Sequence, residues 1–195
     1  MYTLRNIFTA ENQAFSDVSI LGNFIDNHDN PRFLHQASEK QMRNALAFSM
    51  TMQGIPIMYY GTEQLFHGGN DPEDREPLWT TNLEITDTYT WIATINKART
   101  ETKWFQETQI ERWADELFYA YTRGTTLCLF SNDYNAGQGR TINYHEYKVG
   151  DVLQNIFNPA DQVIVTENGV TVTVSAGVPK IYTLVNKEGI EEEII

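Results

Sequence analysis

A dense cluster of polar side chains follows a short apolar run near the start of the chain. Residues 24–33 read FIDNHDNPRF and contain Asp26, His28, Asp29 and Arg32. Carboxylates, an imidazole and a guanidinium can donate and accept hydrogen bonds and stabilise developing charge, as a substrate site requires. Asp, Asn and Pro are also standard turn residues, so a solvated turn is the alternative interpretation.

Two further polar segments lie downstream. A second apolar run, residues 55–60, ends in the aromatic and polar residues of 59–64, YYGTEQ. Residues 68–79, GGNDPEDREPLW, then combine glycines, carboxylates, an arginine and a tryptophan. Charged groups beside an aromatic face suit sugar hydroxyls and sugar ring faces. Taken alone, the tyrosines also fit packing within a strand, and the later segment also fits an ordinary polar loop.

The elements that would position these segments form a βαβ unit. The spacing predicts strands at 20–25 and 55–60 and a helix at 39–53. Ser38 and Gln41 form a capping-box pattern at the start of this helix, and Gly54 lies just after its end. A short apolar run directly after a helix predicts a strand that is buried on both sides.

In parallel β/α architectures, active sites collect at the carboxyl ends of the strands. All three polar segments follow predicted strands and are therefore expected on one rim of the fold. A further helix is predicted at 87–103, with an apolar side made of Tyr89, Ile92, Ala93 and Ile95.

The pattern changes near residue 106. The second part has short runs rich in β-branched and aromatic residues, which predict an antiparallel sandwich. Asn168-Gly169 predicts a hairpin between two of these runs, and residues 135–139 read as a loop. The predicted strands are 117–121, 125–130, 163–166, 170–174 and 180–185.

Three strings together resemble the α-amylase family. The string Phe-Ile-Asp-Asn-His-Asp at 24–29 resembles the family signature on barrel strand seven, and residues 54–64 resemble the eighth strand. Residues 68–76 resemble the loop that follows that strand in fungal-type α-amylases. The motifs cover about residues 1–105, whereas 107–186 match the family only by position and predicted class.

The resemblance implies a role for each of four residues. Asp29 would match the third catalytic carboxylate, which holds the 2- and 3-hydroxyls of a sugar and stabilises an oxocarbenium-like transition state. His28 would hydrogen-bond hydroxyls in the same subsite. Asp71 and Arg75 would bind the next glucose unit on the non-reducing side.

The resemblance also implies that other parts of the machinery are absent. Retaining glycoside hydrolysis needs a nucleophilic carboxylate and a proton-donating acid about 5 Å apart. In the family these are an Asp and a Glu on strands four and five, upstream of the Asn-His-Asp string. A whole (β/α)₈ barrel takes about 250 residues. Asp26 and Glu63 are candidates for a relocated nucleophile by position only.

The expected fold is α/β plus all-β: the carboxyl-terminal portion of a (β/α)₈ TIM barrel, followed by an antiparallel β-sandwich. The domains are expected at 1–105 for the partial barrel with strands seven and eight, at 106–187 for the sandwich, and at 188–195 for an acidic tail. The family's calcium site is built mostly upstream, so calcium is expected in a full-length parent, and no ligand is placed here.

Composition excludes several classes. The net charge is −12 with no basic cluster, which argues against nucleic acid or an anionic membrane surface as a partner. Cys128 is the only cysteine, so no disulfide can form within the chain, and its apolar run predicts an inert core thiol. No apolar run reaches the roughly 18 residues of a membrane span, and no signal peptide is expected.

Several single residues have ordinary interpretations. His35 and His67 flank the predicted site but are expected to be solvated surface histidines. Trp79 fits a sugar-stacking role or a packing role equally well.

Three functions remain open. The first is part of a starch-degrading α-amylase that cleaves internal α-1,4-glucosidic bonds with retention and is inactive without its missing carboxylates. The second is a non-catalytic α-glucan-binding protein, and the third is a transglycosylase or an α-1,6-cleaving relative. The expected partners are starch, glycogen and maltooligosaccharides, and the expected parent is a monomer. Family members are often secreted, but nothing in this chain assigns a location.

Overall fold

The computed structural model describes residues 1–185, so the acidic tail predicted at 188–195 lies outside the described residues. The α-helices are α1 (Tyr2–Ala14), α2 (Phe33–Gln36), α3 (Glu39–Thr51) and α4 (Asp87–Thr102). Short 3₁₀ helices are η1 (Val18–Ile20), η2 (Thr62–Gln64), η3 (Leu78–Thr81) and η4 (Trp104–Gln106). The strands are β1 (Gly22–Asn23), β2 (Ile55–Pro56), β3 (Gln109–Ala114), β4 (Phe118–Arg123), β5 (Thr126–Ser131), β6 (Gly137–Ile142), β7 (Val152–Asn155), β8 (Asn158–Ile164), β9 (Val170–Ser175) and β10 (Lys180–Leu184).

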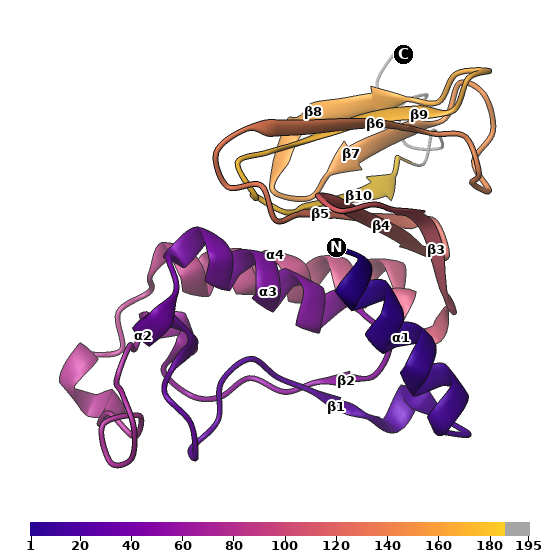
Figure 1. Cartoon of the computed structure of the whole chain (residues 1–195). Coiled ribbons are helices and arrows are strands. Elements are labelled where there is room, and N and C mark those ends of the chain that lie inside the picture. The colour runs from indigo at the N-terminus through magenta and orange to yellow at the C-terminus, as the bar shows by residue number, and fades with distance from the viewer. Residues whose placement is uncertain (186–195) are drawn as a thin grey trace.

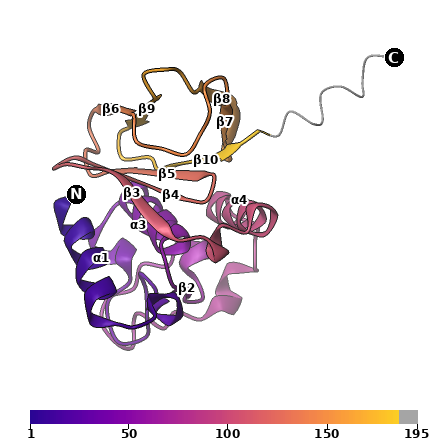
Figure 2. The same ribbon diagram turned by 90° about the vertical axis from the view of Figure 1, so that its right-hand side faces the viewer.

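These elements stack in layers. The parallel pair β1–β2 lies below α3 and α4, and these helices lie below the large antiparallel sheet (Figure 1). The ribbon of β6 and β9 covers the opposite face of that sheet, as the turned view in Figure 2 also shows. Among residues 1–185, no helix is long and apolar enough to cross a bilayer.

The predicted βαβ unit is confirmed. β1 and β2 pair in parallel, with Gly22 opposite Ile55, and α3 connects them. Ser38 begins α3 with the expected capping box, because its side chain and that of Gln41 each accept the other's backbone N–H. Gly54 has a φ of +117°, and a Cβ there would lie 2.6 Å from the Leu21 carbonyl oxygen. Only glycine therefore fits this link between helix and strand.

The two parallel strands are shorter and more exposed than predicted. Each has two residues, and Ile55 and Ile57 keep about half of their surface exposed (51% and 50%). The prediction of a second strand buried on both sides is therefore wrong for this chain. The physical reason is that α3 packs against β2, whereas within residues 1–185 no third strand joins the pair.

Helix α3 is well buried, as its sequence predicts, but the apolar side of α4 differs from the prediction. Ile92 and Ile95 are buried, whereas Tyr89 and Ala93 are exposed. Thr88 and Ala98 are buried instead, and spacings of four, three and three residues place these four on one helical face.

The large sheet has the strand order β3-β4-β5-β10-β7-β8, and every neighbouring pair is antiparallel. Its two faces contribute to two apolar cores. One core lies between the sheet and helices α3 and α4, and includes Leu46, Ile95, Tyr121 and Phe130. The other lies between the sheet and the β6–β9 ribbon, and its members are Phe118, Ala120, Leu127, Leu129, Ile142, Tyr147, Leu153, Val165, Val170, Val172, Val174 and Tyr182.

Several strands of the sheet region differ from those predicted from the sequence. β3, β7 and most of β8 are not predicted, and the predicted loop at 135–139 forms the start of β6. At the hairpin predicted for Asn168-Gly169, one antiparallel bridge joins Thr166 and Gly169, but β9 then pairs with β6 and not with β8. Thr166 and Gly169 do form a tight turn, with two backbone hydrogen bonds of 3.0 Å. A Cβ on Gly169 would lie 2.2 Å from the Ile142 carbonyl oxygen, so this turn seats the chain against β6.

Buried polar contacts join the helical layer to the sheet. Arg123 at the end of β4 donates to the Thr51 and Met52 carbonyls at the end of α3, at 3.3 and 2.9 Å. The Thr51 and Tyr121 hydroxyls are 2.7 Å apart. Asn44 of α3 donates to the Ser131 carbonyl of β5 at 2.9 Å. The boundary near residue 106 is therefore a change of secondary structure across which the core is continuous.

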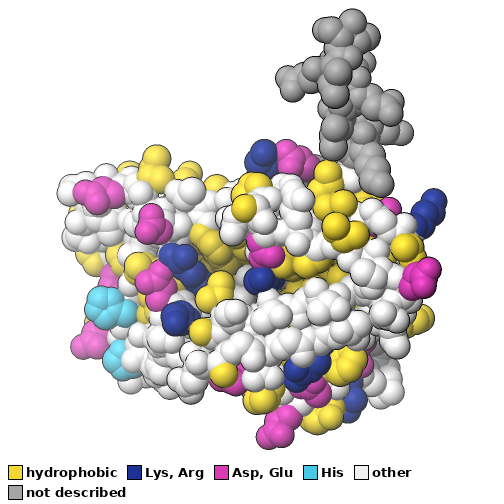
Figure 3. Space-filling model, turned by 90° about the horizontal axis from the view of Figure 1, so that it is seen from above, with side chains coloured by type: hydrophobic (Ala, Val, Ile, Leu, Met, Phe, Trp, Pro, Cys, Tyr) yellow, Lys and Arg dark blue, Asp and Glu magenta, His cyan; other side chains and the backbone are white. Residues whose placement is uncertain are grey.

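Charge is distributed without a basic patch on the face that Figure 3 shows. There, Lys and Arg side chains are interspersed with Asp and Glu.

Candidate functional site

The loops that follow β1 and β2 bring the four predicted site residues together. Arg75 donates from Nε and Nη2 to the backbone carbonyl of His28, at 3.1 and 3.0 Å. Its Nη2 also lies 3.1 Å from Asp71 Oδ2, and His28 Nε2 lies 3.4 Å from Asp29 Oδ1. Asp29 and Asp71 are 42 residues apart in the sequence. Together with their neighbours His28 and Arg75 they form one cluster, His28, Asp29, Asp71 and Arg75.

The cluster is open to solvent. The side chains of His28 and Asp29 are 65% and 70% exposed, and those of Arg75 and Asp71 are 45% and 53% exposed. Two carboxylates, a guanidinium and an imidazole thus offer acceptors and donors on one surface. Such a set can bind a neutral ligand that carries many hydroxyl groups, because each hydroxyl both donates and accepts.

Local hydrogen bonds shape the loop that carries Asp29. The Asn27 side-chain oxygen accepts from the backbone N–H of Asp29 at 2.8 Å and from Asn30 Nδ2 at 3.1 Å. This is an Asx turn, in which a side chain replaces a backbone acceptor. The turn-forming residues of the string therefore hold the Asp29 backbone in place, so the turn interpretation and the site interpretation are compatible.

Asp26 and Arg32 do not lie where a substrate could reach them, contrary to the prediction for the segment 24–33. Asp26 is 5% exposed, and its two oxygens accept from the Phe33 N–H and the Thr62 hydroxyl, each at 2.7 Å. Arg32 is fully buried. Asp26 is therefore unsuited to act as a relocated nucleophile, because both of its oxygens are occupied inside the protein.

Glu76 is a polar residue of this region to which the sequence analysis gives no role. Its Oε1 accepts from the backbone N–H groups of His67 and Gly68, at 2.8 and 2.7 Å, and its Oε2 lies 3.2 Å from Arg32 Nε. The only signal in the sequence is a carboxylate next to Arg75. That signal is weak because the partners of Glu76 lie eight, nine and 44 residues earlier in the chain.

The aromatic residues at the end of the second apolar run enclose the Arg32 guanidinium. Its central carbon lies 4.1 Å from the ring centre of Tyr59 and 5.1 Å from that of Tyr60. Burial raises the pKa of the Tyr59 hydroxyl. These tyrosines are therefore bound to a buried cation beneath the loops that carry the cluster.

The remaining single-residue predictions have separate outcomes. His35 and His67 are exposed, as predicted. Trp79 is 81% exposed, which excludes the packing role within the described residues. Cys128 is buried, and burial raises its pKa to about 12, which agrees with an inert core thiol.

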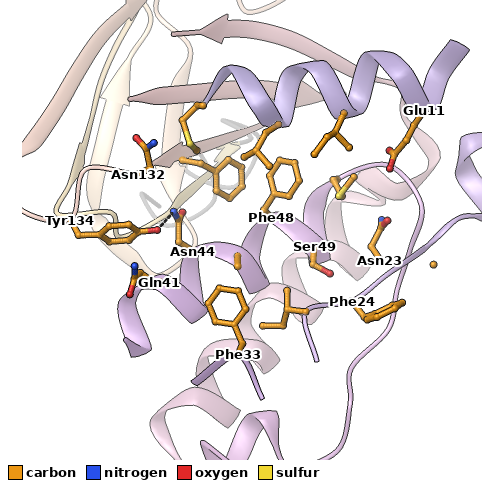
Figure 4. A pocket seen from close by; sticks show the side chains of 18 residues that line it. Glu11, Asn23, Phe24, Phe33, Gln41, Asn44, Phe48, Ser49, Asn132 and Tyr134 are labelled. Carbon is orange, nitrogen blue, oxygen red and sulfur yellow. Dashed lines mark hydrogen bonds between the residues drawn. The ribbon is translucent and has the colours of Figure 1, made fainter. Parts of the chain in front are cut away.

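A mainly apolar hollow is separate from the cluster. It lies between α1, α3 and β1, and its lining includes Phe24, Phe33 and Phe48 (Figure 4). At one end Asn44 donates to the Tyr134 hydroxyl at 3.2 Å. No residue of the His28, Asp29, Asp71 and Arg75 cluster lines this hollow.

Within residues 1–185, no three His, Cys, Asp or Glu side chains gather closely enough to hold a metal ion.

Comparisons with known proteins agree on one family. The sequence model described as the catalytic domain of alpha-amylase matches residues 1–126. Beta/alpha-amylase of Paenibacillus polymyxa is 34% identical over an alignment that covers 93% of this chain and 17% of that protein. Alpha-amylase 2 of Schwanniomyces occidentalis is 30% identical, with 85% of this chain and 35% of that protein covered.

The fold is similar to solved structures with the same description. The alpha-amylase of Malbranchea cinnamomea superposes with a TM-score of 0.88 at 25% identity, covering 94% of this chain and 41% of that one. This chain therefore spans much less than two thirds of the length of the relatives that it matches.

Proposed function

The chain belongs to the α-amylase family of glycoside hydrolases, and from that premise we propose that it is the substrate-holding part of an α-amylase. The parent enzyme would cleave internal α-1,4-glucosidic bonds of starch or glycogen with retention. In this part, Asp29 would hold the 2- and 3-hydroxyls of one glucose unit and stabilise positive charge on its ring in the transition state. His28 would hydrogen-bond the same unit.

The observation that carries the proposal is the position of Arg75. Its guanidinium donates to the His28 carbonyl and pairs with Asp71, so the loop after β1 and the loop after β2 present one continuous surface. Asp71 and Arg75 would bind the adjacent glucose unit through its hydroxyls. Hydrogen bonds to charged groups contribute about 1.5–3 kcal/mol each, which suits recognition of an uncharged sugar.

The proposed place of the chain in the parent fold rests on exposed apolar surface. β1 and β2 would be strands seven and eight of a (β/α)₈ barrel, and β3–β10 the sandwich that follows. Ile20 and Phe24, at the ends of β1, are 68% and 51% exposed, and Ile55 and Ile57 of the second strand segment are similarly bare. Because β1 and β2 are paired, these side chains belong to one exposed part of the fold, and an exposed apolar patch marks an interface. The remaining barrel strands would cover it.

The nucleophilic Asp and the acid/base Glu are not assigned to any residue of this chain. Asp26 is enclosed, and the cluster carboxylates Asp29 and Asp71 already contact His28 and Arg75. We therefore expect the 195-residue chain to bind α-glucan without hydrolysing it. This property also defines the second candidate function, a free-standing non-catalytic glucan-binding protein.

Binding and cleavage are tested on the same sample. Isothermal titration of the chain with maltoheptaose measures binding, and an assay for reducing ends measures cleavage. Asp71→Asn and Arg75→Gln should each weaken binding about tenfold, the effect of losing roughly 1.4 kcal/mol. Arg5→Gln changes a half-buried arginine on α1 whose side chain hydrogen-bonds to Asn6, away from the cluster. It is the matched control and should bind like the unmodified chain.

Two results would contradict the proposal. If the chain does not bind maltoheptaose, or if Asp71→Asn and Arg75→Gln bind as tightly as the control, the cluster is not a glucan site. Release of reducing ends by the chain would contradict the assignment of a purely binding role. In a longer parent enzyme, Asp29→Asn should lower turnover by far more than tenfold, because charge stabilisation in the transition state is lost.

A further inference from the structure

Arg32 is a fully buried cation between the two loops that carry the cluster. Its Nε donates to the Asp74 carbonyl at 2.8 Å, and its Nη1 donates to the Tyr60 carbonyl at 2.7 Å. Its own backbone N–H donates to the Gly68 carbonyl at 3.0 Å. The loop after β1 is therefore tied to three separate points on the loop after β2.

Glu76 completes the connection from the other side. Its Oε2 lies 3.2 Å from Arg32 Nε, and its Oε1 accepts from the His67 and Gly68 backbone N–H groups. One carboxylate thus neutralises the buried guanidinium and also closes the loop 67–76 on itself. Removing either member of the pair would leave a charge without its partner inside the protein, which is costly.

Arg32 and Glu76 each lie close in the sequence to a residue of the cluster. Arg32 lies three residues after Asp29, and Glu76 directly follows Arg75. A change in the distance between Arg32 and Glu76 would therefore move Asp29 relative to Arg75. We propose that Arg32 and Glu76 are positioning residues, a brace that holds the two halves of the cluster at the separation of adjacent glucose units. Its role in glucan binding rests on the proposed function.

The brace needs an arginine specifically. The guanidinium is a planar fork whose nitrogens reach acceptors on different sides, and it also lies over the Tyr59 ring. Within residues 1–185 its Nη2 has no hydrogen-bond partner, so the ring contact and the other two nitrogens hold it. The ammonium group of a lysine is a point charge that cannot hold the Tyr60 and Asp74 carbonyls and the Glu76 carboxylate in this arrangement.

Arg123 provides a matched control. It is also a buried arginine whose nitrogens donate to backbone carbonyls, but it joins β4 to the end of α3 and to η4. Arg32→Lys and Arg123→Lys are the same chemical change. Both should lower stability, so a difference between them at the cluster cannot arise from stability alone.

The first test measures local opening without any ligand. Native chain is treated with trypsin, and mass spectrometry gives the initial rates of cleavage after Arg75, in the exposed loop, and after Arg140, in β6. Arg32→Lys should raise the ratio of these rates at least fivefold, whereas Arg123→Lys should leave the ratio unchanged. Glu76→Gln keeps the side-chain shape and serves if Arg32→Lys does not fold. Because Glu76 follows the cleaved bond, its ratio is divided by the ratio for the same variant unfolded in urea, and this corrected ratio should rise as it does in Arg32→Lys. An unchanged ratio in the folded Arg32→Lys and Glu76→Gln variants would overturn the brace.

The second test measures maltoheptaose binding. Arg32→Lys should weaken binding about tenfold and Arg123→Lys less than twofold. The Arg32→Lys, Arg75→Gln double variant should bind about as weakly as Arg75→Gln alone, because Arg32 acts through Arg75. Equal losses in the two lysine variants would overturn the positioning role. A chain that does not bind at all contradicts the proposed function, while the trypsin ratio still decides the brace.

Discussion

The contact between β4 and the carboxyl end of α3 gives a quantitative prediction about stability. Arg123 is 3% exposed and donates four hydrogen bonds to the carbonyls of Thr51, Met52, Phe105 and Glu107, over distances of 2.9–3.3 Å. Arg123→Met keeps most of the apolar stem and removes every donor. The substitution therefore isolates the hydrogen bonds from the packing of the side chain.

The expected loss in the free energy of unfolding depends on which carbonyls would be left without a donor where water cannot reach them. The bonds to Thr51 and Met52 are buried, so their carbonyls would lose their donor where water cannot replace it. Each such group costs about 1–3 kcal/mol. The carbonyls of Phe105 and Glu107 are only partly buried and can bind water. The free energy of unfolding should fall by about 3 kcal/mol, and the midpoint of thermal unfolding by roughly 6–12 °C for a chain of this size.

Urea and thermal unfolding followed by circular dichroism measure both quantities. Lys97→Met, at an exposed position on α4, is the control and should stay within about 0.5 kcal/mol of the unmodified chain. A loss below about 1 kcal/mol in Arg123→Met would refute the reasoning. The hydrogen bonds of Arg123 would then contribute little to holding the helical layer on the sheet.

Two further predictions concern buried and partly buried polar groups. Burial tends to raise the pKa of Asp115, but hydrogen bonds from Arg140, Trp113 and the backbone of Leu117 and Phe118 outweigh it and hold the pKa well below its usual range. Because the folded pKa is the lower one, this stabilisation is present above the unfolded pKa of about 4 and is lost as pH falls towards the folded value. Urea unfolding between pH 5 and pH 2 should therefore show a smaller loss of stability in Asp115→Asn than in the unmodified chain, and parallel curves would contradict the assignment. Tyr121→Phe removes the hydroxyl that lies 2.7 Å from Thr51 Oγ1 and should cost about 1 kcal/mol in the same assay, because Thr51 still donates to the Ala47 carbonyl. A cost above about 3 kcal/mol would show that the ring itself has moved.

The elements with strong local signals are predictable from the sequence. The capping box at Ser38 is satisfied locally, and the β-branched run of β9 alternates buried and exposed residues. β3 and β6 have no such signal, because β3 carries Gln109, Glu111 and Arg112, and β6 begins with alternating glycines. Their strand conformation depends on pairing with β4 and β9, which is a long-range effect.

Among the site residues, too, local sequence signals predict some positions, and long-range contacts determine others. The rim position of His28, Asp29, Asp71 and Arg75 could be anticipated because polar residues follow parallel strands. The burial of Arg32 could not, because its acceptors are backbone carbonyls 28 and 42 residues further along the chain. A sequence shows the type of each side chain, but every residue has a backbone carbonyl. Only the fold decides which of these carbonyls lie beside Arg32.

The core shared by the helical layer and the sheet also limits how this chain can evolve by recombination. The family match ends at residue 126, at the hairpin that joins β4 to β5, while Tyr121 and Phe130 on the two sides of that point pack into one core with Leu46 and Ile95. A genetic crossover there would place unrelated side chains against α3 and α4, and poorly matched packing costs several kcal/mol. The sheet is therefore expected to be inherited together with helices α3 and α4. Substitutions in the core residues of one layer should be accompanied by substitutions in the other.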